Sequence, residues 1–128
     1  MGSPMDYTVH VSNCPPVTVV ETPEFLTRID KLMTDGEREQ LIAYLAANPT
    51  AGDLIPGTGG VRKLRWGLEG RGTRGGARVI YFYQKANLPL FALTIFAKND
   101  RADISQHDRN ALRGLTKLLV DTYRRSRR

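Results

Sequence analysis

The sequence predicts a single α+β domain with a small, mainly antiparallel sheet, an N-terminal helical hairpin and a C-terminal helix. Helix signals with apolar residues at helical spacing lie in residues 22–48 and again after residue 105. Three strand-like segments, 63–68, 77–84 and 90–97, follow one another between them. Consecutive strands with short connections usually pair antiparallel, and 128 residues suit one domain with one core.

The expected limits of the domain are residues 17 and 123. Residues 1–16 are predicted to be a cloning remnant and a flexible arm, and residues 124–128 a basic tail. No apolar run approaches the ~20 residues that cross a bilayer, and we expect neither a signal peptide nor a membrane partner. Cys14, the single cysteine, cannot form an intrachain disulfide. We therefore expect a cytoplasmic protein with no cofactor and no metal.

The N-terminal half reads as a short strand followed by two helices. The strand, Val17 to Val20, stops where Thr22 is predicted to cap a helix that has Pro23 at its first position. A capping-box pattern from Thr34 to Glu37 opens the second helix, which ends at Asn48. The apolar faces expected to be buried are formed by Phe25, Ile29, Leu32, Leu41, Ile42 and Leu45.

The C-terminal half reads as strands and a final helix. Residues 51–60 are predicted to form a loop, and residues 69–76 form a second loop of glycines and arginines. Ser105 is predicted to cap the last helix. Its inner face is predicted to be Leu112, Leu115 and Leu119.

The charge of the chain is concentrated in two places. There are 19 basic and 13 acidic residues, a net charge of +6, and the pI is near 9.8. Six basic residues and only Glu69 on the acidic side lie between Arg62 and Arg78, and a second group lies in the last twelve residues. A small basic domain prefers polyanions as partners.

Alternation along the first of the three strands separates cations from apolar side chains. Lys63 and Arg65 share one face, whereas Leu64, Trp66 and Leu68 share the other. Taken alone, such a pair is also compatible with an ordinary solvated sheet face. More cations accumulate nearby, because Arg78 opens the next strand and Lys98 ends the one after. The register between these strands is left open by the sequence.

RNA contacts are expected around these strands. Glycines beside Arg71 and Arg74 let backbone N–H groups approach a phosphate, although a solvated hairpin tip is an equal reading. Arg62 is expected to add a further cation. Tyr81 is a candidate to stack on a base, although packing in the core is the favoured interpretation. His107, in the first turn of the last helix, is expected to be a neutral surface residue.

Basic residues alone are able to support RNA cleavage. The 2′-OH attacks its own phosphate, so no protein nucleophile is needed. Arginine forks suit the phosphate oxygens, and a lysine crowded by other cations has a lowered pKa that allows proton transfer.

Three stretches together resemble the HigB-type branch of the RelE toxin superfamily. They are LIPGTGGVRKLRW from Leu54, GRGTRGGARVIYF from Gly70 and FAKND from Phe96, within a resemblance that spans Val17 to Leu119. It implies a type II toxin that cuts mRNA in the ribosomal A site. It also implies an antitoxin, often a helix-turn-helix protein, whose complex with the toxin binds operator DNA.

The resemblance also suggests site residues. Lys63, Arg65, Arg78 and Lys98 fall at the family's basic positions, and Arg78 corresponds to the arginine that contacts the phosphate. Some members use a C-terminal tyrosine, which the segment after Lys98 lacks. Lys63 is our hypothesis for the general base. Two alternatives stay open: a ParE-like toxin that poisons DNA gyrase, and a non-catalytic nucleic-acid-binding module.

Overall fold

The computed structural model describes residues 16–68, 72–85, 87–97 and 105–126. In chain order its elements are β1 (Val19–Glu21), α2 (Pro23–Leu32), α3 (Asp35–Ala47), β2 (Asp53–Leu54), β3 (Val61–Leu68), β4 (Gly72–Phe82), β5 (Leu90–Ala97) and α4 (Gln106–Ser126). A search of these residues finds no helix with the length and apolar character that crossing a membrane requires.

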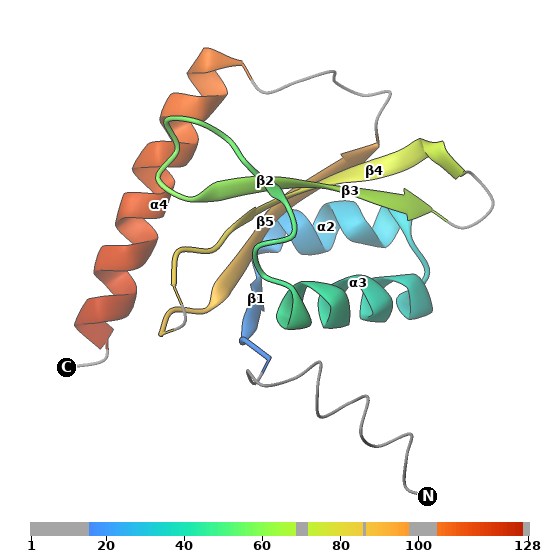
Figure 1. Cartoon of the computed structure of the whole chain (residues 1–128), viewed down its shortest axis with the longest axis horizontal. Helices are drawn as coiled ribbons and strands as arrows, with labels where there is room; N and C mark the ends of the chain where they lie inside the picture. The colour runs from blue at the N-terminus through green and yellow to red at the C-terminus, as the bar shows by residue number, and fades with distance from the viewer. Residues whose placement is uncertain (1–15, 69–71, 86, 98–104, 127–128) are drawn as a thin grey trace, which may run out of the picture.

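Five strands form one sheet in the order β1-β5-β4-β3-β2 (Figure 1). Three neighbouring pairs are antiparallel, and β1 alone runs parallel to its neighbour β5. The expected α+β fold with a mainly antiparallel sheet is confirmed. Strand β4 lies at the centre, so it has a paired strand on each side and a layer of side chains on each face.

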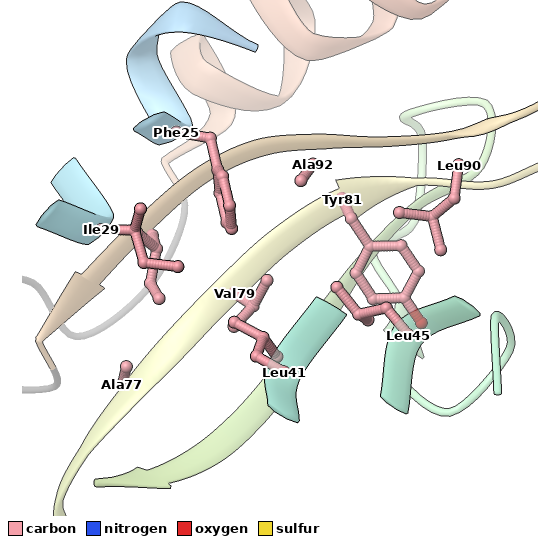
Figure 2. Packing of buried hydrophobic residues seen from close by; sticks show 10 residues of the cluster. Phe25, Ile29, Leu41, Leu45, Ala77, Val79, Tyr81, Leu90 and Ala92 are labelled. Carbon is pink, nitrogen blue, oxygen red and sulfur yellow. The ribbon is translucent and has the colours of Figure 1, made fainter. Parts of the chain in front are cut away.

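One face of the sheet is covered by α2 and α3, which run in opposite directions (Figure 1). Phe25 and Ile29 of α2 are one helical turn apart and point at the sheet, as do Leu41 and Leu45 of α3 (Figure 2). They pack on β4 and β5 through a cluster that also includes Ala77, Val79, Tyr81, Leu90, Ala92 and Ile95. The predicted amphipathic hairpin is confirmed in these four residues.

The other face carries α4 and a second apolar cluster. Leu112, Leu119 and Val120 of α4 pack against a buried group made of Ile55, Val61, Ile80, Phe82, Phe91, Leu93 and Phe96. Leu115, predicted to belong to the inner face, is instead 38% exposed. The reason is that the sheet is twisted where α4 crosses it, so only a narrow strip of the helix surface contacts the sheet. Leu115 lies outside that strip.

The two helix starts differ in how their threonines are used. Thr34 forms the predicted capping box, with its hydroxyl accepting from Glu37 N and its own N–H donating to the Glu37 carboxylate. Thr22 occupies the N-cap of α2 but makes no side-chain cap. Its hydroxyl donates to the carbonyls of Ala92 and Leu93 at 3.0 and 3.1 Å, so it ties α2 to β5 instead.

Several boundaries differ from the sequence prediction, three of them by more than two residues or by a whole element. Residues 51–60 contain the short strand β2, which pairs with β3. Strand β4 begins at Gly72, so Arg74 lies in the strand and not in the predicted glycine loop. Helix α4 continues to Ser126 and therefore includes Arg124 and Arg125. A two-residue strand and a glycine-rich strand start have weak local signals and form because a partner strand supplies their hydrogen bonds.

Tyr81 and Arg62 hold the segment before β2 against the sheet. Tyr81 is completely buried, and its hydroxyl accepts from Gly52 N and donates to Pro49 O, each at 2.8 Å. Arg62 donates from Nη1 to the carbonyls of Gly52 and Thr50. The candidate role of Tyr81 in stacking on RNA is therefore wrong, because its ring lies in the core among apolar side chains.

Gly52 allows this contact because a side chain there would have no room. A Cβ atom on Gly52 would lie 3.0 Å from the Tyr81 ring and hydroxyl and from the Lys63 carbonyl. The glycine, Tyr81 and Arg62 thus form one unit that fixes β2 on the edge of the sheet.

We expect Tyr81→Phe to lower the free energy of unfolding by about 1–3 kcal/mol, because it leaves the buried N–H of Gly52 and the partly buried carbonyl of Pro49 without a partner. Denaturant unfolding at neutral pH measures this loss. Tyr44→Phe is the matched control, because Tyr44 is 40% exposed. Equal stability of the Tyr81→Phe variant and the native protein would contradict the role of the hydroxyl.

Burial raises the pKa of Tyr81 above its ordinary value of 10.0. The stability that this shift represents is complete below pH 10.0 and is lost as the pH rises through the folded-state pKa, because the unfolded chain releases the proton first. We expect the native protein to lose more stability than Tyr81→Phe over this alkaline range. Unfolding midpoints of both proteins against pH measure the difference, and parallel curves would contradict it.

Candidate nucleic-acid interface

The pairing of β3 with β4 places two arginines directly opposite each other. Arg65 is the register partner of Arg78, and Lys63 is the partner of Ile80. Directly opposed residues on neighbouring antiparallel strands have Cβ atoms about 4.5–5.5 Å apart and project to the same face of the sheet. Arg65 and Arg78, called the cation pair below, therefore stand side by side.

The side chains next to Arg78 along β4 are buried. Within Ala77–Phe82, Arg78 is the one residue that is not buried, and the other five are completely buried. Ala77, Val79 and Tyr81 belong to the cluster under α2 and α3, whereas Ile80 and Phe82 belong to the cluster under α4. Arg78 thus occupies the place on the α4 face where the helix no longer covers the central strand.

Lys63 extends the cation pair along β3. It precedes Arg65 by two residues, so the two side chains share a face and their Cα atoms lie about 7 Å apart. Leu64 and Trp66 pack instead against the cluster under α2 and α3. The predicted separation of Lys63 and Arg65 from Leu64 and Trp66 is confirmed.

Among the residues that the structure describes, no carboxylate forms an ion pair with the cation pair. The two ion pairs found in the described part of the chain join Arg28 to Glu24 and Arg38 to Glu21, and neither involves β3 or β4. Arg78 makes one long hydrogen bond, from Nη1 to Ala77 O at 3.4 Å. Since a guanidinium has five N–H donors, most of the donors of Arg78 make no hydrogen bond within the described residues.

The other predicted residues are distributed differently. Arg62 lies on the opposite face of β3, where it donates to backbone carbonyls, and so it is separated from the cation pair. Arg74 lies in β4, while Arg71 and Lys98 fall outside the described residues. His107 is exposed in the first turn of α4, as expected. The structure therefore brings together Lys63, Arg65 and Arg78.

A groove beside the cation pair was not predicted from the sequence. Its volume is about 310 Å³, and it is lined by α2, the sheet and α4 through Glu24, Arg28, Ile80, Thr94, Asp108 and Leu115 among others. Ile80 and Thr94 are register partners on its floor, and the next outward pair on that face is Arg78 with Phe96. No local signal predicts this groove, because its walls come from four segments distant in sequence.

Fold and charge together define a small basic α+β domain with a sheet face suited to anions. The family model described as the RelE toxin of the RelE/RelB toxin–antitoxin system matches residues 30–126. The chain therefore belongs to the RelE toxin family, and it is a toxin of a toxin–antitoxin system.

We expect removal of one charge of the cation pair to stabilise the fold. Like charges directly opposite on a sheet are destabilising, and Arg65→Thr should raise the free energy of unfolding by about 0.2–1 kcal/mol. Denaturant unfolding at low salt measures the gain, which should shrink as added salt screens the repulsion. Arg125→Thr, near the end of α4, is the control for a general effect of net charge. A destabilised Arg65→Thr variant would contradict the repulsion.

Proposed function

We propose that this toxin is a ribosome-dependent, metal-independent endoribonuclease that cuts mRNA and so arrests translation. The observation that carries the proposal is the cation pair: two arginines face each other on an open part of the sheet, and no carboxylate of the described residues forms an ion pair with either. A phosphate bound there accepts hydrogen bonds from both guanidinium groups and removes their mutual repulsion. Membership of the RelE toxin family supports the same function.

In the proposed reaction Arg65 and Arg78 hold the scissile phosphate. The 2′-oxygen of the preceding ribose forms a bond to phosphorus, and the bond from phosphorus to the 5′-oxygen breaks. The products are a 2′,3′-cyclic phosphate and a free 5′-hydroxyl. Negative charge builds up on the phosphorane oxygens, and fixed guanidinium groups stabilise that charge more in the transition state than in the substrate.

We assign the first proton transfer to Lys63. The amine of Lys63 takes the proton of the 2′-OH, and the leaving 5′-oxygen takes up a proton from solvent water. Lys63 lies beside Arg65 on the same face, and its register partner on β4 is the buried Ile80. Lys98, which the family resemblance adds to the site, is the remaining basic residue of the proposal.

The proposed partners follow from the same function. The family description supports a cognate antitoxin, and the HigB-type resemblance points to a helix-turn-helix antitoxin whose complex with the toxin binds operator DNA. The ribosome and its mRNA are the target, and the cytoplasm is the compartment in which translation offers it.

We expect Arg78→Ala to abolish growth arrest and mRNA cleavage while the fold survives, because the variant loses half of the cation pair. The measurement is a map of mRNA 5′ ends in cells expressing the chain, where cuts should fall within translated reading frames. Arg125→Ala is the control, since it removes the same charge from the end of α4.

Two outcomes would contradict this proposal. One is a folded Arg78→Ala variant that remains fully toxic with unchanged cleavage. The other is growth arrest accompanied by DNA damage without mRNA cuts, which would instead identify a gyrase poison.

We expect Lys63→Arg to separate binding from proton transfer. Arginine keeps the positive charge but does not deprotonate in proteins, so affinity for a 2′-O-methyl RNA that cannot be cleaved should be nearly unchanged. Single-turnover cleavage should fall by about 10²–10⁴-fold. Equal cleavage rates, with an unchanged dependence on pH, would show that Lys63 is not the base.

A further inference from the structure

Helix α4 carries a second group of cations, separate from those on β3 and β4. With 3.6 residues per turn, Arg113, Lys117 and Arg124 fall within about 40° of arc and extend over about 16 Å of the helix axis. Lys85, which follows β4, lies near the same end of α4, because it lines a hollow together with Tyr123 and Arg124. These four residues, Lys85, Arg113, Lys117 and Arg124, are called the α4 basic cluster.

The cluster borders two adjoining hollows that share Arg124. The first, of about 270 Å³, lies between α4, Gly59 and the end of β4, and Arg113, Lys117 and Arg124 line it. The second, of about 240 Å³, adds Lys85. Asp121 also lines the first hollow, so the two hollows together carry four positive charges and one negative charge. In the described part of the chain, Asp121 forms no ion pair with any of these cations.

The backbone under these cations is firmly held. Thr116 of α4 donates to Thr58 O at 3.0 Å, and both threonines are buried. Thr58 in turn bridges Ile55 O and Val61 N. The loop before β3 and the middle of α4 therefore form one rigid wall, which keeps Arg113 and Lys117 in a fixed relation to the sheet.

The α4 basic cluster and the cation pair lie on opposite sides of α4. On β4, Phe82 lines the first hollow, while Arg78 is four residues away, about 13 Å along the strand. Between them lies Ile80, which is completely buried under the apolar side chains of α4. The side of α4 that faces the groove next to Arg78 presents Ala111 and Leu115 and not the basic cluster. An RNA strand held at the cation pair therefore cannot run along the sheet to the α4 basic cluster.

The composition of the hollows favours a phosphate backbone over a protein partner. The exposed large apolar residues of the described chain are Val20, Leu26, Tyr44, Leu54, Leu115 and Leu118, and none of them lines either hollow. The apolar residues that do line the hollows are buried or half-buried: Phe82, Leu88, Val120 and Tyr123. Protein interfaces are anchored by buried aromatic and aliphatic side chains at their centre. Binding to nucleic-acid backbones, by contrast, needs cations spaced along a surface and no apolar anchor.

We propose that the α4 basic cluster is a second RNA-binding site, which holds the phosphate backbone of an RNA segment other than the one that is cut. The choice of RNA as ligand rests on the proposed function, whereas the site does not depend on cleavage. Its role is to position the toxin on a structured RNA, so that the cation pair on the far side of α4 is presented to the scissile strand.

The test compares two triple variants that lose the same charge. The first, Arg113→Gln with Lys117→Gln and Arg124→Gln, neutralises the cluster. The control, Lys31→Gln with Arg38→Gln and Arg125→Gln, neutralises cations on α2, on α3 and outside the arc on α4. The probe is a 2′-O-methyl RNA hairpin, which lacks the attacking hydroxyl. Fluorescence anisotropy at a series of salt concentrations gives the affinity and its salt dependence.

We expect the cluster variant to bind the hairpin more weakly and to reduce the slope of log K against log salt by about 2, since each lost phosphate contact removes about 0.7–0.9. The control variant should change the slope by less than about 0.5. Circular dichroism and the unfolding midpoint establish that both variants fold.

Equal affinities and slopes for the two triple variants would overturn the inference. Unchanged hairpin binding by the cluster variant, with lost binding to poly-glutamate, would also overturn it and would indicate an acidic protein partner. Because the probe cannot be cleaved, failure of Arg78→Ala to affect mRNA cleavage would contradict the proposed function without affecting this comparison.

Discussion

The two-sided burial of strand β4 is the constraint on which the rest of the structure depends. Its side chains alternate between the cluster under α2 and α3 and the cluster under α4, so both layers are assembled on one strand. A central strand covered on both faces must be apolar almost throughout. Arg78 interrupts that rule at the one position from Ala77 to Phe82 that is not buried. The end of the α4 layer therefore decides where the central strand is able to carry a charge.

The arrangement around Arg78 sets charge repulsion against the proposed chemistry. Arg65 and Arg78 are directly opposed, and their like charges repel each other. Placing them on paired strands has a benefit that a loop would not give: the backbones are fixed by the ladder of hydrogen bonds, so the two guanidinium groups need little reorganisation to hold a phosphate. Helix α4 then acts as a divider, with the cation pair on one side and the α4 basic cluster on the other.

Much of the fold could be predicted from local patterns. The capping box at Thr34, the apolar spacing of Phe25 with Ile29 and the alternation around Lys63 and Arg65 all depend on residues within one or two turns or within one strand, and the structure has them as expected. The sequence predictions were wrong or incomplete where a residue distant in the sequence supplies the hydrogen-bonding partner. The Thr22 hydroxyl bonds to β5, about 70 residues away, instead of capping its own helix, and β2 exists only because β3 pairs with it.

The sequence by itself determined which residues are basic, which face of β3 they share and the order of the helices and of the strands other than β2, because these properties follow from residue type and local periodicity. The tertiary structure alone decided that Arg65 stands opposite Arg78, because the register of two strands depends on their connection and on both layers that pack on them. It also decided that Arg62 and Tyr81 hydrogen-bond to the backbone near Gly52 and do not belong to the basic surface, since these partners come from a separate segment. The candidate site is thus a product of pairing and packing, built from cations that the sequence had already supplied.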